Sequence, residues 1–269
     1  MGTIAVTGAA SGIGACVAAR LTARGHRVIG VDLRGTDVAA DLGTPEGRSE
    51  AVAEVTRLSE GRLDGFVPFA GIAGGTGRSP GLLVSVNYFG AVDVLEGLRP
   101  LLAAAGTSSV VLISSNSTTT QAGWHPELAD ACLAGDEGAA CALGESLADE
   151  GGVLAYPATK AALAYYTRTR AADYIVDGIR LNAVAPGFID TPMTRAGRED
   201  PRVADGMKAY LAAIPAGRAG RPEEVADLVL FLLSAASAYC VGSLMFCDGG
   251  LDAKLRGLEW PKAATRRPR

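Results

Sequence analysis

The chain has 269 residues, of which 48% are hydrophobic and 20% charged, and its mean hydropathy is +0.21. This composition is typical of a folded soluble domain and excludes a polar, disordered chain. The net charge of −4 and the isoelectric point near 5.3 argue against a surface for nucleic acid or anionic membrane, so neither partner is expected. Within the tail, 254–269, the end KAATRRPR is locally basic, and we interpret it as a solvated end.

Cysteine and histidine usage indicates an intracellular protein without a metal. The five cysteines form no CxxC pair and leave an odd one over, which fits reduced thiols in the cytoplasm. The two histidines, His26 and His125, lie far apart, so we expect neither a metal site nor a histidine-based triad. The start, MGTIAVTG, has neither the basic segment nor the apolar core of an export signal.

Apolar runs rich in β-formers alternate along the chain with alanine-rich amphipathic segments. The expected strands are 3–8, 27–32, 65–71, 108–115, 179–187 and 243–250. Most segments between the first five strands are long enough for crossover helices. This pattern predicts the α/β class, with a single doubly wound, Rossmann-type parallel sheet and helices on both faces. No repeat or low-complexity linker interrupts it, so we predict one domain over 1–269.

The first strand leads directly into TGAASGIG at 7–14, which opens a predicted helix. Glycines at Gly8, Gly12 and Gly14 let the backbone turn tightly and approach a pyrophosphate, whose charge the helix start can meet. Three spaced glycines in a chain with 35 of them are weak evidence alone. Their place between a strand and a helix nevertheless indicates a dinucleotide site, to which Ser11 and Ile13 also belong.

The second strand ends at Asp32, 18 residues past Gly14. A carboxylate there accepts hydrogen bonds from ribose hydroxyls and repels a 2′-phosphate, which favours NAD over NADP. Arg34 could instead pair with such a phosphate, whereas Ser11 stands where a basic residue would have helped NADP. Beyond the strand we assign Leu33, Asp41 and Leu42 to the adenosine end of the cofactor, with Asp41 either a contact to the adenine or an ordinary helix-start residue.

The stretch YPATK at 156–160 uses one of only 4 lysines in a chain with 21 arginines. Pro157 fits the first turn of a helix, and residues four apart share a helix face, so Tyr156 and Lys160 are expected to point into the same space. A close cation lowers the pKa of a phenol by favouring the phenolate. Lysine can do this as a compact charge that also reaches a ribose, whereas the arginine fork is bulkier. The spacing alone is suggestive rather than decisive.

The run at 228–246 holds 19 residues without a charge and could be mistaken for a membrane span. Pro222 and the two glutamates that follow it predict a helix start. Ser234, Ser237 and Gly242 then divide the run into a helix of about four turns, at 222–235, and a separate strand.

Six motifs, taken together, resemble the short-chain dehydrogenase/reductase family across nearly the whole chain. They are TGAASGIG (7–14), SVNYFG (85–90), LISS (112–115), YPATK (156–160), APGFIDTP (185–192) and CDGG (247–250). The resemblance implies a catalytic tetrad of Asn87, Ser115, Tyr156 and Lys160. Ser115 would polarise the carbonyl, Tyr156 would pass the proton, Lys160 would lower the tyrosine pKa and hold the ribose, and Asn87 would anchor a water in a proton relay. It also implies cofactor contacts from Ala70, Gly71, Tyr156, Lys160, Pro186, Gly187, Ile189 and Thr191.

Two departures from the family pattern stand out. Phe69, Ala70 and Gly71 replace the usual Asn-Ala-Gly turn, so another group must stabilise it. Ser115 and Tyr156 are 41 residues apart, far more than is usual in the family, and the extra segment at 116–151 contains two predicted helices near 126–134 and 137–149. This insertion resembles the bacterial 3α-hydroxysteroid dehydrogenase/carbonyl reductase subgroup. The alternative is a surface elaboration without a substrate role.

The resemblance therefore implies an NAD-dependent alcohol dehydrogenase or carbonyl reductase of a bulky apolar substrate. A hydroxysteroid is the first candidate and an aromatic, coniferyl-type alcohol the second. A lid at 188–220 could supply an apolar wall or only packing, through Ile189, Met193, Met207, Tyr210 and Leu211. A non-catalytic NAD-sensing regulator is the alternative of another class, and the intact Ser, Tyr and Lys set argues against it.

We also predict a twofold homodimer through the element at 222–247. In the family, the helices that carry the asparagine and the tyrosine usually form one dimer interface, and we expect the insertion to cover that surface within the same chain. The apolar 222–247 element would then form the contact between two copies, with Leu230 and Leu233 in it.

Overall fold

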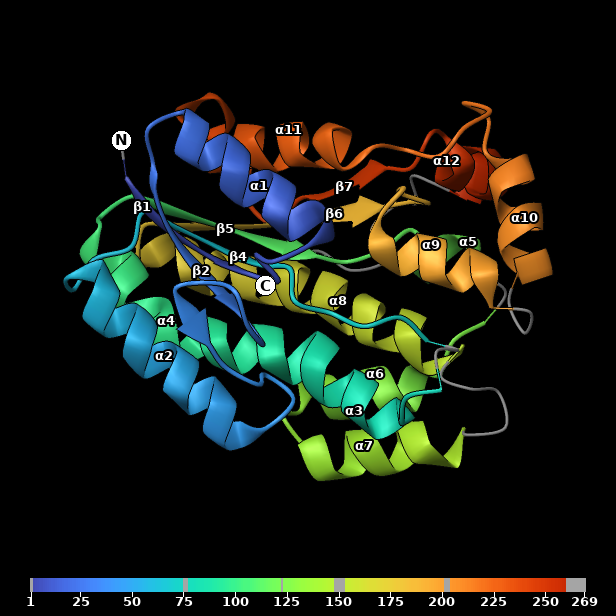
Figure 1. The fold of residues 1–269 in the computed structure, drawn as a ribbon, viewed down its shortest axis with the longest axis horizontal. Helices are drawn as coiled ribbons and strands as arrows, with labels where there is room; N and C mark the ends of the chain where they lie inside the picture. Colours follow the sequence, from blue (N-terminus) through green and yellow to red (C-terminus); the bar gives the residue numbers. More distant parts are fainter. Residues whose placement is uncertain (1, 75–76, 122, 148–152, 201–203, 260–269) are drawn as a thin grey trace.

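The computed structural model describes residues 2–74, 77–121, 123–147, 153–200 and 204–259. Seven parallel strands form one sheet in the order β3-β2-β1-β4-β5-β6-β7 (Figure 1). The strands are β1 (Thr3–Thr7), β2 (Arg27–Asp32), β3 (Val38–Ala39), β4 (Gly65–Pro68), β5 (Ser108–Ile113), β6 (Ile179–Pro186) and β7 (Leu244–Cys247). The order reverses between β1 and β4, which makes the sheet doubly wound and confirms the predicted fold class.

All six expected strands are present, and the sequence missed only β3 among the strands of the described residues. β3 pairs Val38 with Val31 and Ala39 with Asp32. Two residues are too few to show a periodicity, so this strand had no signal in the sequence. β4 is shorter than predicted and ends at Pro68, which has no backbone N–H to donate to a ladder.

Helices cover both faces of the sheet, as Figure 1 shows. One face carries α1 (Gly12–Ala23) and α11 (Pro222–Leu233), and the other carries α2 (Pro45–Ser59), α4 (Gly90–Ala104) and α8 (Ala155–Val176). Alternate side chains of a strand point to opposite faces. Accordingly, Ile4 and Val6 pack in the cluster under α1 and α11, whereas Ala5 belongs to the larger cluster on the opposite face.

Helix α4 continues a helical run that begins with α3 (Pro80–Val84) and passes through a π-helical turn, η1 (Ser85–Phe89). Single π turns inside helices are frequent at functional sites, and this one carries Asn87. The whole run, Pro80–Ala104, is 25 residues long and apolar enough to cross a membrane, but 72% of its most apolar window is buried inside the molecule. This run therefore forms part of the hydrophobic core.

The insertion forms α5 (Ser117–Thr120), α6 (Pro126–Leu133) and α7 (Glu137–Ser146). Helices α6 and α7 lie where two helices were predicted, although 148–149 of the second prediction fall outside the described residues. α6 packs against α8, and α7 packs against α3 (Figure 1). Leu128 and Cys132 of α6 are fully buried, so the insertion is part of the hydrophobic core.

The region between β6 and α11 contains α9 (Pro192–Glu199) and α10 (Ala204–Ala213), and α12 (Leu251–Arg256) follows β7. These three helices gather beyond one end of the sheet, at the right in Figure 1. α11 ends at Leu233, so it is shorter than the predicted four turns, and the uncharged run at 228–246 is divided between this helix and β7 as expected. Two 3-10 turns, η3 (Ala235–Ser237) and η4 (Gly257–Glu259), complete the described elements. Of the predicted tail, 260–269 lies outside the described residues.

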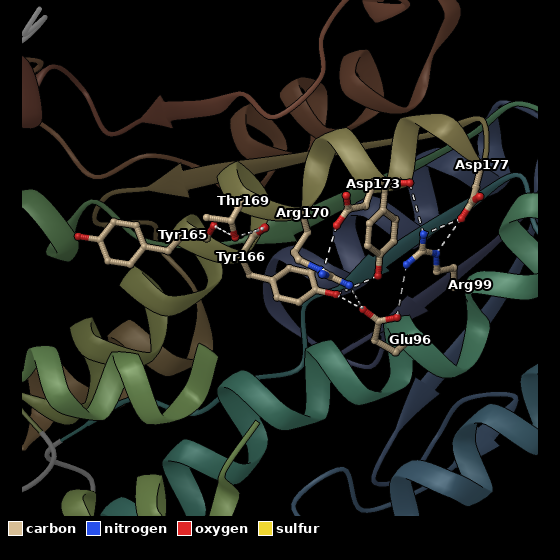
Figure 2. A network of polar contacts seen from close by, with 9 residues as sticks. Glu96, Arg99, Tyr165, Tyr166, Thr169, Arg170, Asp173 and Asp177 are labelled. Carbon is tan, nitrogen blue, oxygen red and sulfur yellow. Dashed lines mark hydrogen bonds and ion pairs between the residues drawn. The ribbon is translucent and has the colours of Figure 1, made fainter. Parts of the chain in front are cut away.

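A polar network joins α4 to α8 (Figure 2). The Tyr166 hydroxyl donates to Glu96 and lies 2.9 Å from the Tyr174 hydroxyl, and Arg99 donates to Asp177 at 2.7 Å. Burial raises the pKa of both tyrosines, so both phenols stay neutral at physiological pH. The network holds α8, whose first turns carry Tyr156 and Lys160, against α4.

Candidate active site

A cavity of about 390 Å³ opens at the carboxyl ends of β1 and β4, where the strand order reverses. Ligands of open α/β sheets bind at this point. The cavity is lined by every residue that the sequence assigned to the cofactor, namely Gly8, Ser11, Gly12, Ile13, Gly14, Asp32, Leu33, Asp41, Leu42, Ala70, Gly71, Tyr156, Lys160, Pro186, Gly187, Ile189 and Thr191. Segments that are far apart in the sequence thus meet at one site.

The glycine-rich loop after β1 fits closely against the turn after β4. Gly8 has a φ of +70°, and a Cβ there would lie 2.7 Å from the backbone nitrogen of Ala70, while a Cβ at Gly14 would lie 2.2 Å from the carbonyl oxygen of Gly8. Only glycine can occupy both positions without displacing the loop. Ser11, at the N-cap of α1, makes no side-chain cap hydrogen bond, so the helix start can offer its N–H groups to an anion. This loop fits a dinucleotide pyrophosphate.

Asp32 lies at the rim of the cavity, at the end of β2. One carboxylate oxygen accepts a hydrogen bond from the backbone N–H of Ala10 at 3.0 Å, and the other accepts one from Leu33 at 2.8 Å. Each oxygen keeps a lone pair that can accept a ribose hydroxyl. Among the described residues that line the cavity, the cations are Lys160 and Arg78, so Arg34 is not part of this lining.

Two other side chains stabilise the turn after β4, where the family pattern has an asparagine that this chain lacks. The Thr7 hydroxyl accepts a hydrogen bond from the N–H of Ala70 at 3.0 Å. Asn87 accepts from the N–H of Ile72 at 2.8 Å and donates to the Ile72 carbonyl at 2.9 Å. Asn87 is only 1% exposed and is not among the residues that line the cavity. Its contacts stabilise the turn, and its predicted part in a water relay remains a prediction.

The other three residues of the predicted tetrad meet at the cavity. Tyr156 and Lys160 lie in the first two turns of α8, and Ser115 lies two residues past β5. The Ser115 hydroxyl lies near enough to the Tyr156 phenol to influence its pKa. The Lys160 ammonium donates to the carbonyl of Ile113 at 3.1 Å and lies 5.7 Å from the centre of the Tyr156 ring. A hydroxyl pair and a buried cation thus face the same space.

Burial dominates the protonation of this pair. It raises the pKa of Tyr156, and the Ser115 hydroxyl opposes that shift. Burial also lowers the pKa of Lys160 to about 8, because the ammonium loses its hydration. Burial and Ser115 are the causes of the Tyr156 shift, and the Lys160 ammonium donates to the Ile113 carbonyl. The predicted lowering of the Tyr156 pKa by Lys160 therefore stays a prediction.

The predicted lid contributes to the site in two different ways. Ile189 and Met193 line the cavity. Met207, Tyr210 and Leu211 instead pack against a separate apolar cluster formed by Phe188, Ile214 and Leu251. The first two residues thus form part of the cavity wall, whereas the other three serve packing. This holds for the described part of the lid, which excludes 201–203.

Sequence reasoning missed several residues of the lining. Leu82 and Val86 are four residues apart on the helical run that leads to Asn87, and this spacing on one helix face was a usable signal. Arg78 lies in a loop without a motif, so no sequence signal pointed to it. The other lining residues that the sequence assigned neither to the cofactor nor to the tetrad nor to the lid wall are Ala40, Phe69, Ile72, Ile113, Ser114, Pro192 and Thr194.

Comparisons with known proteins agree with this geometry. Residues 2–126 match the family model described as short chain dehydrogenase, and residues 144–252 match the one described as enoyl-(acyl carrier protein) reductase. The 3-alpha-hydroxysteroid dehydrogenase/carbonyl reductase of Comamonas testosteroni is 40% identical over 256 residues, which are 95% of this chain and 98% of that protein. The cis-4-hydroxycyclohexanecarboxylate dehydrogenase of Sinomonas cyclohexanicum is 33% identical, with coverage of 92% and 95%.

A solved structure shares the fold closely. It is the crystal structure of the 3-alpha-hydroxysteroid dehydrogenase from Pseudomonas sp. B-0831 complexed with NADH. The two chains superpose with a TM-score of 0.89 at 40% sequence identity, over 94% of this chain and 98% of the other. The likeness therefore extends over nearly the whole of both chains.

Proposed function

The chain belongs to the short-chain dehydrogenase/reductase family of oxidoreductases. From this membership we propose that it interconverts a secondary alcohol and a ketone on a bulky apolar substrate of the 3α-hydroxysteroid kind. We propose NAD as its cofactor. The observation that carries the proposal is the Ser115 and Tyr156 hydroxyl pair, which lies beside the buried Lys160 in the cavity lined by the glycine-rich loop.

The chemistry follows from the protons that these residues can hold. A nicotinamide cofactor, when bound, supplies the acceptor or donor of the hydride. Tyr156 has a neutral phenol in this pocket and can give a proton to a carbonyl oxygen, or take one from an alcohol. Ser115 can hold the same oxygen by a hydrogen bond. Lys160, with a pKa lowered to about 8, can exchange a proton near neutral pH and replenish the phenol.

Three features support the choice of substrate and cofactor. Ile189 and Met193 provide apolar surface in the cavity. The two named relatives act, according to their names, on hydroxyl groups of saturated rings, and the solved relative contains NADH. Asp32 at the end of β2 would repel the extra phosphate of NADP.

A spectrophotometric screen tests the proposal. The purified protein is incubated with NAD or NADP and a 3α-hydroxysteroid, its 3β-epimer or an aryl alcohol, or with NADH or NADPH and a diketone. The formation or loss of reduced cofactor is followed. We expect turnover of the 3α-hydroxysteroid with NAD. Preference for the aryl alcohol would favour an aromatic alcohol dehydrogenase. Binding of NADH without turnover of any of these substrates would favour the sensing regulator.

A further inference from the structure

Arg48 of α2 is a buried cation whose side chain is only 4% exposed. Its guanidinium donates to both carboxylate oxygens of Glu137, at 3.1 and 2.5 Å. The same group lies 3.4 Å from the carbonyl oxygen of Leu42, and its Nε lies 3.0 Å from a carboxylate oxygen of Asp93. Glu137 is the first residue of α7, so this pair links the insertion to the body of the fold.

The Leu42 carbonyl belongs to a turn that forms one wall of the cavity. Asp41 and Leu42 line the cavity at the end where the strand-end carboxylate Asp32 also lies, which is the adenosine end of the proposed cofactor site. Asp41 is itself held by a hydrogen bond from the N–H of Gly43 at 2.9 Å. The bidentate Arg48–Glu137 pair thus stabilises this turn from behind, through the Leu42 carbonyl.

The opposite end of α7 holds the adjoining part of the cavity wall. Glu145 accepts hydrogen bonds from the Ser79 hydroxyl at 2.6 Å and from the N–H of Gly81 at 2.9 Å. Both donors lie at the start of α3, the helix that carries Leu82 into the cavity lining. The two walls touch, because a Cβ on Gly43 would lie only 2.9 Å from the Cδ1 atom of Leu82.

We infer that the helical insertion is a working part of the cofactor site. Glu137 and Glu145, at the two ends of α7, are positioning residues that hold the turn at 41–44 and the start of α3 around the adenosine of the cofactor. The inference rests on the proposed function, since it takes the cavity as the NAD site. It gives the insertion a role that differs from surface elaboration and from contact with the substrate.

The test compares Glu137→Gln and Glu145→Gln with a matched control, Glu54→Gln. Glu54 is ion-paired with Arg57 on the exposed side of α2 and does not line the cavity. Calorimetry measures the Kd of NADH and that of AMP, which carries only the adenosine end. We expect each α7 variant to raise both Kd values about tenfold, the order expected for the loss of one hydrogen bond to a charged group, while the control changes neither.

Kinetics and thermal unfolding separate this role from a general loss of structure. At saturating NAD, kcat of the α7 variants should stay within about twofold of the wild type, because only cofactor binding is weakened. A lower Tm with unchanged Kd values would overturn the inference, as would a weaker NADH Kd with an unchanged AMP Kd. If Glu137→Gln failed to fold, the Kd values of Glu145→Gln, at an exposed position, would test the inference alone. A wild-type protein that bound neither NADH nor AMP would refute the proposed function instead.

Discussion

The hydroxyl of Tyr210, on lid helix α10, lies 2.5 Å from the side-chain oxygen of Asn116, the residue that follows Ser115. Asn116 in turn donates to Asp248 at 3.2 Å, just past the end of β7. Burial raises the pKa of Tyr210 to about 12, so its hydroxyl stays protonated and can donate at neutral pH. The described part of the lid is therefore tied to the strand end that carries the predicted catalytic serine.

Replacing Tyr210 with phenylalanine removes this tie and leaves the ring packed against Phe188. We expect KM for the substrate to rise roughly tenfold while kcat changes little, since a lost hydrogen bond of this kind weakens closure over the substrate rather than the proton transfer. Steady-state kinetics measure both, with the half-exposed Tyr165→Phe as the control. An unchanged KM would show that the bond does not position the lid.

The predicted acid–base pair gives the sharpest kinetic expectation. Tyr156→Phe should keep the affinity for NAD and lower kcat by about 10²- to 10⁴-fold, the usual contribution of a positioned proton donor. Lys160→Arg should also impair turnover, because the planar, bulkier guanidinium cannot take the place of the compact ammonium that donates to the Ile113 carbonyl at 3.1 Å. A kcat for Tyr156→Phe within a few-fold of the wild type would mean that another group moves the proton.

The buried lysine also makes stability depend on pH. Lys160 titrates near 8 in the folded protein, against an ordinary value of 10.5. Between these values the unfolded chain binds a proton that the folded protein has released, so the free energy of unfolding should rise with pH, by about 3 kcal/mol if the whole shift is expressed. Above pH 10 the raised pKa of Tyr156 acts in the opposite direction, since the unfolded tyrosine then loses its proton first.

Lys160→Met tests this linkage. Urea unfolding of the wild type and the variant, followed between about pH 8 and pH 10, should show a wild-type gain in stability that the variant lacks. Two parallel curves would mean that the lysine keeps its ordinary pKa in the folded protein.

Cofactor choice should depend on Asp32. We expect the wild type to have a higher kcat/KM with NAD than with NADP, and Asp32→Ser to narrow that difference by removing the charge that repels the 2′-phosphate. Glu46→Gln, at an exposed position of α2, serves as the control for a general change in net charge. A wild-type preference for NADP would instead point to a cation such as Arg78 in the cavity.

Sequence alone could predict those parts of the site that local chain geometry determines. Gly8 and Gly14 are readable because a strand must turn into a helix there, and Tyr156 with Lys160 because residues four apart share a helix face. Arg48 and Glu137 are 89 residues apart, and Asn87 meets Ile72 only after the turn has folded back, so neither contact leaves a pattern along the chain. The raised pKa of Tyr156 likewise depends on burial, which spacing cannot reveal.

Leu230, which the sequence placed in the predicted dimer contact, is buried within its own chain. Leu230 is only 3% exposed and packs in the core under α1 and α11, so an aspartate there would disrupt the fold and could not report on assembly. The apolar residues of α11 are buried within the same chain, against α1 and against β5, β6 and β7. Two large apolar side chains of the 222–247 element are exposed, namely Phe231, at 39%, and the fully exposed Tyr239, and β7 is the last of the described strands of the sheet.

We therefore still predict a twofold homodimer through the 222–247 element, now with Phe231, Tyr239 and the edge of β7 in the contact. Among the described strands β7 is the last of the sheet, and an edge strand together with exposed aromatic side chains favours self-association. Phe231→Asp combined with Tyr239→Asp should give monomers with a nearly unchanged Tm, since neither side chain is buried in the chain's own core. Leu133→Asp, on exposed surface of the insertion, should leave the dimer whole. Light scattering decides between these outcomes, and a wild-type monomer at micromolar concentration, or a tetramer, would refute the arrangement.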